Sequence, residues 1–449
     1  MLHLMTMLTP SGVHLAGWRH PKSWGELTMN LDHAIELAQI AEAGKLDMVF
    51  VADGNAVRWV DSPAYFEANG PSDRPATFEP LTLYGAISQH TKHIGLLATA
   101  TTTYEEPYLV ARRFASLDHL SSGRVGWNVV TGSFPGDSKN FSREEHPEKA
   151  ARYERANEFV DVCKGLWDSW AADAFLEDKA TGRFLDAARV HVLDHRGEYF
   201  SVRGPLNVAR SPQGYPVLCV AGQSEAGREL AAKHADVVFS VSTNLSDSQE
   251  FYADIKGRLA AYDRSPDTLK ILPGCTVYVG REEGEAEAFY DELQGLITPA
   301  LGVPYLSRLL QTDLSEFAVD GPLPDLPEET NAIASFRDEI LRMAQRDHLT
   351  IRETYERVLP ARGHVIFKGT ASQVADEMQA WYEAGGADGF MVGMAVQPSG
   401  LRDFIELVVP ELQRRGLFRT DYEGRTLREH LGLPLPKNQF FDAEALARR

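Results

Sequence analysis

The chain has 449 residues, of which 43% are hydrophobic, and its 64 acidic and 45 basic side chains give a formal net charge of −19. This balance argues against nucleic acids and anionic membrane surfaces as partners, because both repel an acidic protein. The length suits one large barrel with insertions or two to three ordinary domains, and the composition is that of a globular protein.

The amino-terminal stretch MLHLMTMLTPSG shows no signal-peptide pattern, and no apolar run in the chain is long enough to span a bilayer. We therefore expect a cytoplasmic protein. The first 130 residues then alternate between expected strands and helices. Strands are expected at His3–Leu8, Asp47–Asp53, Ile94–Thr101 and Arg124–Val130, and helices at 31–43, 79–90 and 108–120. Such alternation predicts a parallel sheet covered by helices.

The rest of the chain continues this pattern with interruptions. A long helix is expected at 152–170, a small β-excursion at 171–211, an inserted lid or side structure at 281–362 and a helix at 372–384. The tail after Leu401 is expected to form a helix and then an extended arm. The expected strands lie near residues 4, 49, 97, 127, 218, 238, 275 and 390.

Eight such strands with helices between them predict an α/β fold, a TIM-like (β/α)8 barrel. The alternative, an open doubly wound sheet, lacks its usual signatures, because no GxGxxG follows the first strand and no Walker motif occurs. We expect a single domain over residues 1–449, with insertions at about 56–77, 171–211 and 281–362.

The three cysteines, Cys163, Cys219 and Cys275, are widely spaced and show no CxxC clustering. They are expected to be buried free thiols. The chain also lacks the HExxH type of histidine pair, so no metal site is expected.

Polar residues follow several of the expected strands, and in a barrel these strand ends meet on one side, where the active site lies. They are Asp53, Thr99, Thr101, Asn128, Gly222 and Ser224. Gly222 and Ser224 open a helix, whose free N–H groups and dipole suit a phosphate. Ordinary loop and cap roles explain that short motif equally well when it is taken alone.

Other donors flank these positions. His146, Lys149, Arg152 and Tyr153 lie at the approach to the long helix and could bind the same ligand, although Arg152 could instead pair with Glu148 on the surface. His20, in the loop after the first strand, is a candidate donor near the reacting centre. A structural role is the commoner one for a lone loop histidine.

Longer motifs resemble a known family. They include SSGRVGWNVVTG at 121–132, RYERANEF at 152–159, LWDSW at 166–170 and AGQSEAGRELAAKHAD at 221–236. These stretches resemble the flavin-dependent monooxygenases of the bacterial luciferase superfamily, in the branch of nitrilotriacetate monooxygenase, dibenzothiophene sulfone monooxygenase and pristinamycin synthase. The resemblance extends over nearly the whole chain.

The resemblance implies a barrel that binds FMN and receives it reduced from a separate NAD(P)H:FMN reductase. With O2, such an enzyme oxygenates a small organic compound, and aromatic, sulfur-containing and nitrogen-containing substrates all fit the branch. A homo-oligomer, dimer or tetramer, is expected. Two alternatives stay open: a non-catalytic flavin-binding protein and a deazaflavin-dependent hydride-transfer enzyme.

The resemblance also implies roles for individual residues. The family pattern is matched by Asp53, Thr99, Asn128, Tyr153 and Ser224. Asp53 and the threonines would lie against the flavin ring, whereas Ser224, Gly222 and Tyr153 would hold the phosphate. His20 and Asn128 are the catalytic candidates.

One position departs from the pattern. Relatives often carry a histidine four residues before the tyrosine, where this chain has Lys149, while His146 matches another histidine of the family. Which of Lys149 and His146 contacts the cofactor is open.

Overall fold

The computed structural model describes residues 1–58, 60, 61, 63, 66, 67, 75–132, 134–310, 312–324, 326, 334–361 and 363–441. Parts of the expected insertions 56–77 and 281–362 therefore lie outside the described residues.

Eight parallel strands close into a barrel, because β10, at one end of the sheet order, pairs with β11 as well as with β9. Around the ring these strands are β1 (His3–Met7), β2 (Met48–Val51), β3 (Gly95–Thr101), β4 (Val125–Val130), β9 (Val217–Val220), β10 (Val237–Ser240), β11 (Lys270–Gly280) and β13 (Gly389–Met394). All eight predicted strands are present, and the predicted (β/α)8 barrel is confirmed.

A ninth strand, β12 (Val365–Thr370), was not predicted. It pairs in parallel with the second half of β11, outside the ring. The eleven-residue β11 pairs with β10 only through Lys270–Pro273, so its later residues have an edge free for β12. The run Val365-Ile366-Phe367 has the β-branched and aromatic composition of a strand and could have indicated it.

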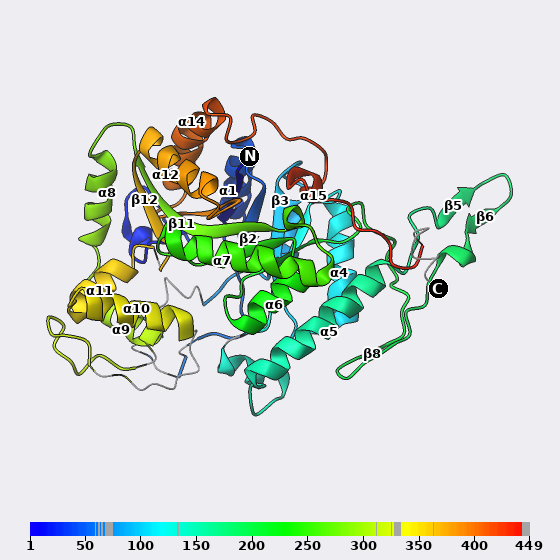
Figure 1. The fold of residues 1–449 in the computed structure, drawn as a ribbon, viewed down its shortest axis with the longest axis horizontal. Coiled ribbons are helices and arrows are strands. Elements are labelled where there is room, and N and C mark those ends of the chain that lie inside the picture. Colours follow the sequence, from blue (N-terminus) through cyan, green and yellow to red (C-terminus); the bar gives the residue numbers. More distant parts are fainter. Residues whose placement is uncertain are drawn as a thin grey trace.

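Helices cover the outside of the barrel (Figure 1). They are α1 (Leu31–Ala43), α3 (Pro80–Ile87), α4 (Pro107–Leu120), α5 (Lys149–Trp167), α6 (Glu225–His234), α7 (Leu245–Arg258) and α12 (Ala371–Glu383). The longest of them, α5, begins three residues earlier and ends three residues earlier than predicted. Its buried Phe159 and Trp167 pack around Trp127 of β4. This packing fixes the approach to α5, which carries several candidate site residues.

An aspartate precedes three of the strands and ties each to a neighbour. The carboxylates of Asp47, Asp236 and Asp388 accept backbone N–H groups of Leu4, Leu218 and Ile271 at 2.7, 2.9 and 2.8 Å. Each bond fixes the register of two adjacent strands at the amino end of the barrel.

The carboxyl-terminal arm closes that end of the barrel. Leu427, in the short helix α15 (Leu427–His430), is fully buried among side chains that point into the barrel, such as Leu97. A Cβ on Gly95 would lie 2.5 Å from Leu427 Cδ1, so the absence of a side chain there leaves room for the leucine. The arm is therefore a plug.

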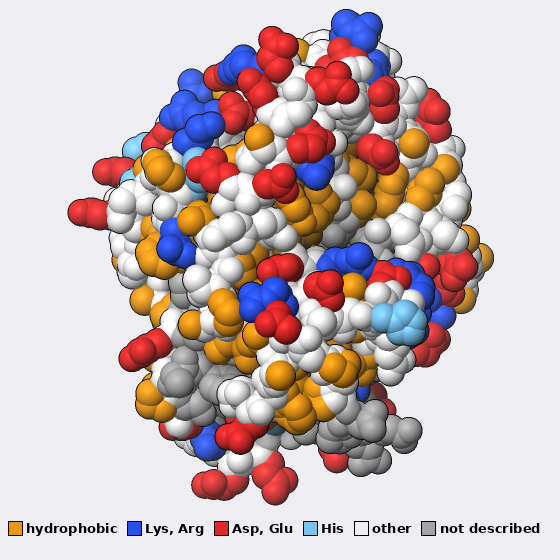
Figure 2. Space-filling view, turned by 90° about the vertical axis from the view of Figure 1, so that its left-hand side faces the viewer, with side chains coloured by type: hydrophobic (Ala, Val, Ile, Leu, Met, Phe, Trp, Pro, Cys, Tyr) orange, Lys and Arg blue, Asp and Glu red, His pale blue; other side chains and the backbone are white. Residues whose placement is uncertain are grey.

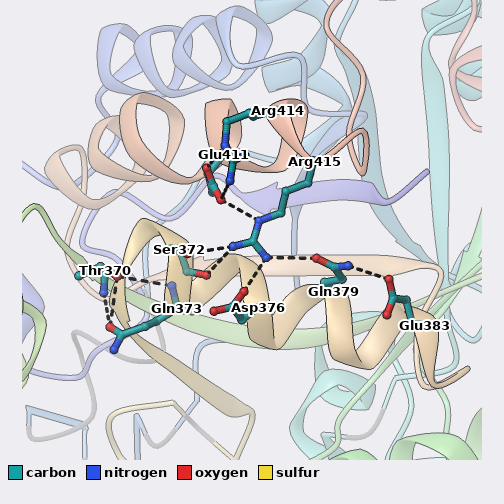
Figure 3. Close-up of polar contacts among 9 residues, drawn as sticks. All are labelled: Thr370, Ser372, Gln373, Asp376, Gln379, Glu383, Glu411, Arg414 and Arg415. Carbon is teal, nitrogen blue, oxygen red and sulfur yellow. Dashed lines mark hydrogen bonds and ion pairs between the residues drawn. The ribbon is translucent and has the colours of Figure 1, made fainter.

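The preceding helix α14 (Val409–Arg414) is fastened to α12 by Arg415 (Figure 3). The Arg415 guanidinium donates hydrogen bonds to Glu411, Asp376, Gln379 and Ser372 at 2.7 to 3.1 Å. This network holds the last helical layer against the barrel.

The expected β-excursion between α5 and β9 is confirmed as two small antiparallel sheets. They comprise β5 (Phe175–Asp178) with β6 (Arg183–Leu185), and β7 (His195–Arg196) with β8 (Ser201–Val202). The β5–β6 hairpin projects from one side of the molecule (Figure 1).

Inserted helices gather at the opposite side (Figure 1). They are α8 (Glu285–Gln294), α9 (Pro299–Leu310), α10 (Ala334–Arg346) and α11 (Ile351–Val358), and α9 was not predicted. Buried Leu306 and Tyr355 of these helices share a core with Leu15 and Ala16 from the loop after β1. The insertion therefore packs against the carboxyl-end loops of the barrel. Acidic and basic side chains are intermixed on this face (Figure 2).

All three cysteines are buried and free, as predicted. Among the described residues, no helix combines the length and apolar character needed to cross a bilayer.

Candidate active site

Thr99 and Asn128 lie side by side at the carboxyl ends of β3 and β4. The two residues are register partners, and Asn128 Nδ2 donates to Thr99 Oγ1 at 3.0 Å. Thr99 in turn donates to the carbonyl of Val51 at 2.7 Å, so the hydroxyl and amide are held by a chain of bonds across three strands. Both side chains are buried.

Asp53, Thr99 and Thr101 line one small cavity of about 90 Å³, together with Gly132 and Asp137. The structure thus brings together Asp53, which follows one predicted strand, with Thr99 and Thr101 of the next strand along the chain. The hydroxyl of Thr101 accepts the backbone N–H of Thr103 at 3.2 Å.

A larger cavity of about 590 Å³ adjoins it and shares Asp53 with it. Its charged lining residues are Asp53, Arg58, Glu79 and Arg308. Glu79 caps α3, since its carboxylate accepts the N–H groups of Leu81 and Thr82. Arg58 lies over the ring of Phe134, and Arg308 comes from the inserted helix α9. The cavity is polar, and two arginines reach it from different segments.

Gly222, Ser224 and Tyr153 meet at a third place, around the start of α6. A Cβ on Gly222 would lie 3.0 Å from the Cα of Gly227 and 3.5 Å from Tyr153 Oη, so only glycine allows this close approach. Ser224 occupies the N-cap position of α6, but its side chain makes no capping bond. The helix therefore presents uncapped N–H groups, beside two hydroxyls, to a ligand.

His146 is held by Tyr104, whose hydroxyl lies 2.5 Å from His146 Nδ1. Burial and the neighbouring Arg152 guanidinium lower the pKa of His146, so its ring is neutral at pH 7. His146 Cε1 lies 3.9 Å from the position of a Cβ on Gly132, and Thr101 Oγ1 lies at the same distance. His146 thus lies near Gly132, which lines the small cavity, whereas Lys149 is exposed at the start of α5.

His20 makes its contacts elsewhere. Its Nδ1 accepts the N–H of Lys22 at 3.1 Å, its Nε2 lies 3.2 Å from Glu292, and its ring meets Phe289 edge-on. These contacts fasten the loop after β1 to α8. They engage both ring nitrogens, so the catalytic hypothesis for His20 gains no support from its surroundings.

Four buried polar atoms of these segments have no hydrogen-bond partner among the described residues. They are Asn128 Oδ1, His146 Nε2, Arg152 Nε and Ser224 Oγ. An unpaired buried polar atom costs about 1–3 kcal/mol, which a bound ligand can recover. The set suits FMN, with the α6 terminus, Ser224 and Tyr153 for its phosphate and the amide of Asn128 for polar ring atoms.

Some residues of the site were not found from the sequence. Tyr104 follows Thr101-Thr-Thr103 at the end of a strand, a position that could have indicated it. Arg58 and Arg308 carry no local signal, since their approach to one cavity depends on how the insertions fold. In the part of the chain that the structure describes, no cluster of three or more potential metal ligands is found.

Comparisons with known proteins show the family of the chain. Residues 5–389 match the family model for luciferase-like monooxygenases. The chain is 48% identical to N-acetyl-S-(2-succino)cysteine monooxygenase of Bacillus subtilis, over 98% of each chain. It is 47% identical to nitrilotriacetate monooxygenase component A of Aminobacter aminovorans, over 95% of each chain.

Among solved structures, long-chain alkane monooxygenase LadA is similar, with a TM-score of 0.83 and 34% identity over 100% of this chain and 99% of that one. The expected branch is confirmed by the nitrilotriacetate relative. The chain belongs to the luciferase-like monooxygenase family, and it is a reduced-FMN-dependent monooxygenase of the two-component type.

Proposed function

We propose that this enzyme oxygenates a small amine or thioether that carries carboxylate groups. When bound, reduced FMN supplies the two electrons with which O2 is activated, so that one oxygen atom enters the substrate and the other leaves as water. The observation that carries the proposal is the pair of arginines, Arg58 and Arg308, lining the 590 Å³ cavity beside Asp53. Arginine binds carboxylates in a two-pronged geometry that lysine cannot match.

The relatives support the same substrate class. Two of them are named for nitrilotriacetate, an amine with three carboxylates, and for N-acetyl-S-(2-succino)cysteine, a carboxylate-bearing thioether. Among the described residues that line the cavity, Asp53 and Glu79 balance the formal charge of the two arginines. The arginines would therefore bind the substrate carboxylates through charged hydrogen bonds and not through a net positive charge of the cavity.

We propose that the chain's own residues act in three ways. Asn128 and Thr99 orient the flavin ring, as do Asp53 and Thr101. Ser224, Gly222 and Tyr153 bind its phosphate. His146, a neutral donor held by Tyr104, contacts the cofactor, and exposed Lys149 takes a lesser part.

The inserted segments complete this assignment. We propose a single barrel domain in which residues 281–362 and 56–77 shield the reacting centre from water, because water diverts activated oxygen to peroxide. We also propose a homo-oligomer that works in the cytoplasm, where NAD(P)H is available to a separate FMN reductase.

A coupled assay tests the substrate class. The purified protein, an NADH:FMN reductase and labelled O2 are incubated with nitrilotriacetate, with S-alkyl thioether carboxylic acids, and with the methyl ester of each. We expect one labelled oxygen atom in the product formed from each acid, and a kcat/KM at least tenfold lower for each ester than for its acid. Equal turnover of acids and esters would overturn the proposal.

Arginine variants test whether the preference for acids over esters arises at Arg58 and Arg308. Arg58→Met and Arg308→Met are expected to raise KM for the acids about tenfold or more, because each removes a charged hydrogen bond to a carboxylate. Arg203→Met is the matched control, since its side chain is 84% exposed and it does not line the cavity. Binding of FMN without oxygenation of any compound would favour the flavin-binding alternative. Turnover only with a deazaflavin would favour hydride transfer.

A further inference from the structure

A third cavity, of about 320 Å³ and with apolar walls, lies beside the polar cavity of about 590 Å³, and nothing in the proposed chemistry uses it. Its walls include Leu8 and Val51 from strand ends, Ala34 of α1 and Leu83 of α3. No charged side chain is found among the described residues that line it. Cavities of this volume with apolar walls suit small organic groups.

The two cavities lie on opposite sides of the barrel wall. Leu8 and Val51 pack on the helix side of the strands. Their chain neighbours Met7 and Ala52 point into the barrel interior, and both line the polar cavity. Residues Pro75–Thr77 line both cavities, so the two spaces adjoin at the rim of the barrel. A molecule seated at Arg58 and Arg308 is therefore next to the apolar cavity.

The mouth of the apolar cavity carries exposed apolar side chains. Trp18 is 42% exposed and Met29 is 47% exposed, and both line it. Met29 also has a φ of 55°, a left-handed conformation that a methionine adopts only at a cost. Such strain is common where the backbone is shaped for binding.

We propose that this cavity binds an uncharged apolar group, an alkyl chain or an aromatic ring, and that the substrate carries this group at the end opposite its carboxylates. The inference rests on the proposed function, since it needs the carboxylate end to lie at Arg58 and Arg308. The enzyme then selects amphiphilic substrates. Arg58 and Arg308 determine the charged end, and Met29 and Trp18 determine the apolar end.

A chain-length series tests this assignment. Thioether carboxylic acids with S-methyl, S-ethyl, S-propyl and S-butyl groups are compared by kcat/KM. Burial of one methylene is worth roughly a fourfold change, so we expect kcat/KM to rise about 30-fold or more from S-methyl to S-butyl. A flat series in which S-methyl is turned over would overturn the inference while leaving the proposed function intact.

Two variants test whether the rise of kcat/KM with chain length arises at this cavity. Met29→Asn introduces a residue that tolerates positive φ and makes the wall polar, and Trp18→Ala removes the indole from the cavity wall. Both side chains are exposed, so folding is expected to be unaffected. Each variant should reduce the S-butyl advantage to less than about fivefold, whereas Leu109→Asn, at an apolar side chain also 47% exposed but outside both cavities, should keep it.

Benzene provides a readout that is independent of turnover. Calorimetric titration of the flavin-free protein is expected to show binding that Met29→Asn weakens at least fivefold. No benzene binding would overturn the inference. Benzene binding without any chain-length effect would mean that the cavity takes a separate apolar molecule, which also overturns it. Benzene binding with no turnover of any thioether acid supports the cavity's ligand class and counts against the proposed function.

Discussion

Arg428 and Asp236 form a two-pronged ion pair, with Nη1 to Oδ1 at 3.0 Å and Nη2 to Oδ2 at 2.9 Å. The pair joins the plug helix α15 to the start of β10. Burial alone would raise the pKa of Asp236, but the charge and hydrogen bonds of Arg428 outweigh it and hold that pKa below its usual value. Asp236 also accepts the Leu218 N–H, so one carboxylate links the plug and two strands.

Removing the cation of this pair should strongly destabilise the fold. Arg428→Met leaves the Asp236 carboxylate buried without its partner, and breaking a buried ion pair in this way costs about 3–5 kcal/mol. Urea unfolding would measure the loss. Arg414→Met, at an arginine whose side chain is 71% exposed, should change the free energy of unfolding by less than about 1 kcal/mol. Equal effects of the two substitutions would refute a role for the pair.

Leu427, an apolar residue of the plug, should contribute as much to the stability of the fold as the ion pair does. Leu427→Ala removes a fully buried side chain from the space above Gly95 and leaves a cavity, which costs about 2–5 kcal/mol. Leu435→Ala, at a leucine 64% exposed, is the control and should have little effect. If unfolding by urea gave the same midpoint for both variants, Leu427 would not be part of the barrel core.

The position of the plug could not be predicted from the sequence. The eight strands and the polar residues at their ends could be predicted, because buried parallel strands are continuous apolar runs and their order follows the chain. The destination of the arm after Leu401 could not, since nothing local in Thr426–His430 says which end of the barrel it meets. The convergence of Arg58 and Arg308 on one cavity likewise depends on tertiary packing, as do the contacts of His20 with Phe289 and Glu292 of α8. The catalytic role of His20 stays a prediction.

Stability should fall in acid partly because of His430. Burial, with the nearby Arg419 charge, lowers the pKa of His430 from 6.5 to about 4. Between these values the unfolded chain binds a proton that the folded chain does not, so the free energy of unfolding decreases as the pH falls through this window. The shift in the pKa of His430 corresponds to a loss on the order of 3 kcal/mol in the free energy of unfolding.

Urea unfolding at pH 7.5 and pH 4.5 checks this expectation against His430→Leu, which cannot titrate. Wild type should lose about 2–3 kcal/mol more than the variant between the two pH values. Identical losses would show that His430 does not contribute to the acid sensitivity.

Gly222 should be intolerant of any side chain. A Cβ there would lie 3.0 Å from Gly227 Cα and would crowd Tyr153 Oη, which moves the turn away from the start of α6. Gly222→Ala is expected to weaken FMN binding about tenfold or more, as followed by quenching of FMN fluorescence. Gly257→Ala is the control, because this glycine of α7 has open space around it and no positive φ, and unchanged FMN binding is expected there.

The central claim is that the start of α6, with Ser224, binds the phosphate of FMN. The most direct test is an anaerobic titration of wild type and Ser224→Ala with reduced FMN and, in parallel, with reduced riboflavin, which has no phosphate. The buried hydroxyl of Ser224 has no partner among the described residues, so its removal should not lower stability. We predict about tenfold weaker binding of reduced FMN by the variant and unchanged binding of reduced riboflavin. Equal affinities of wild type and variant for FMN, or the same loss for both flavins, would contradict the account.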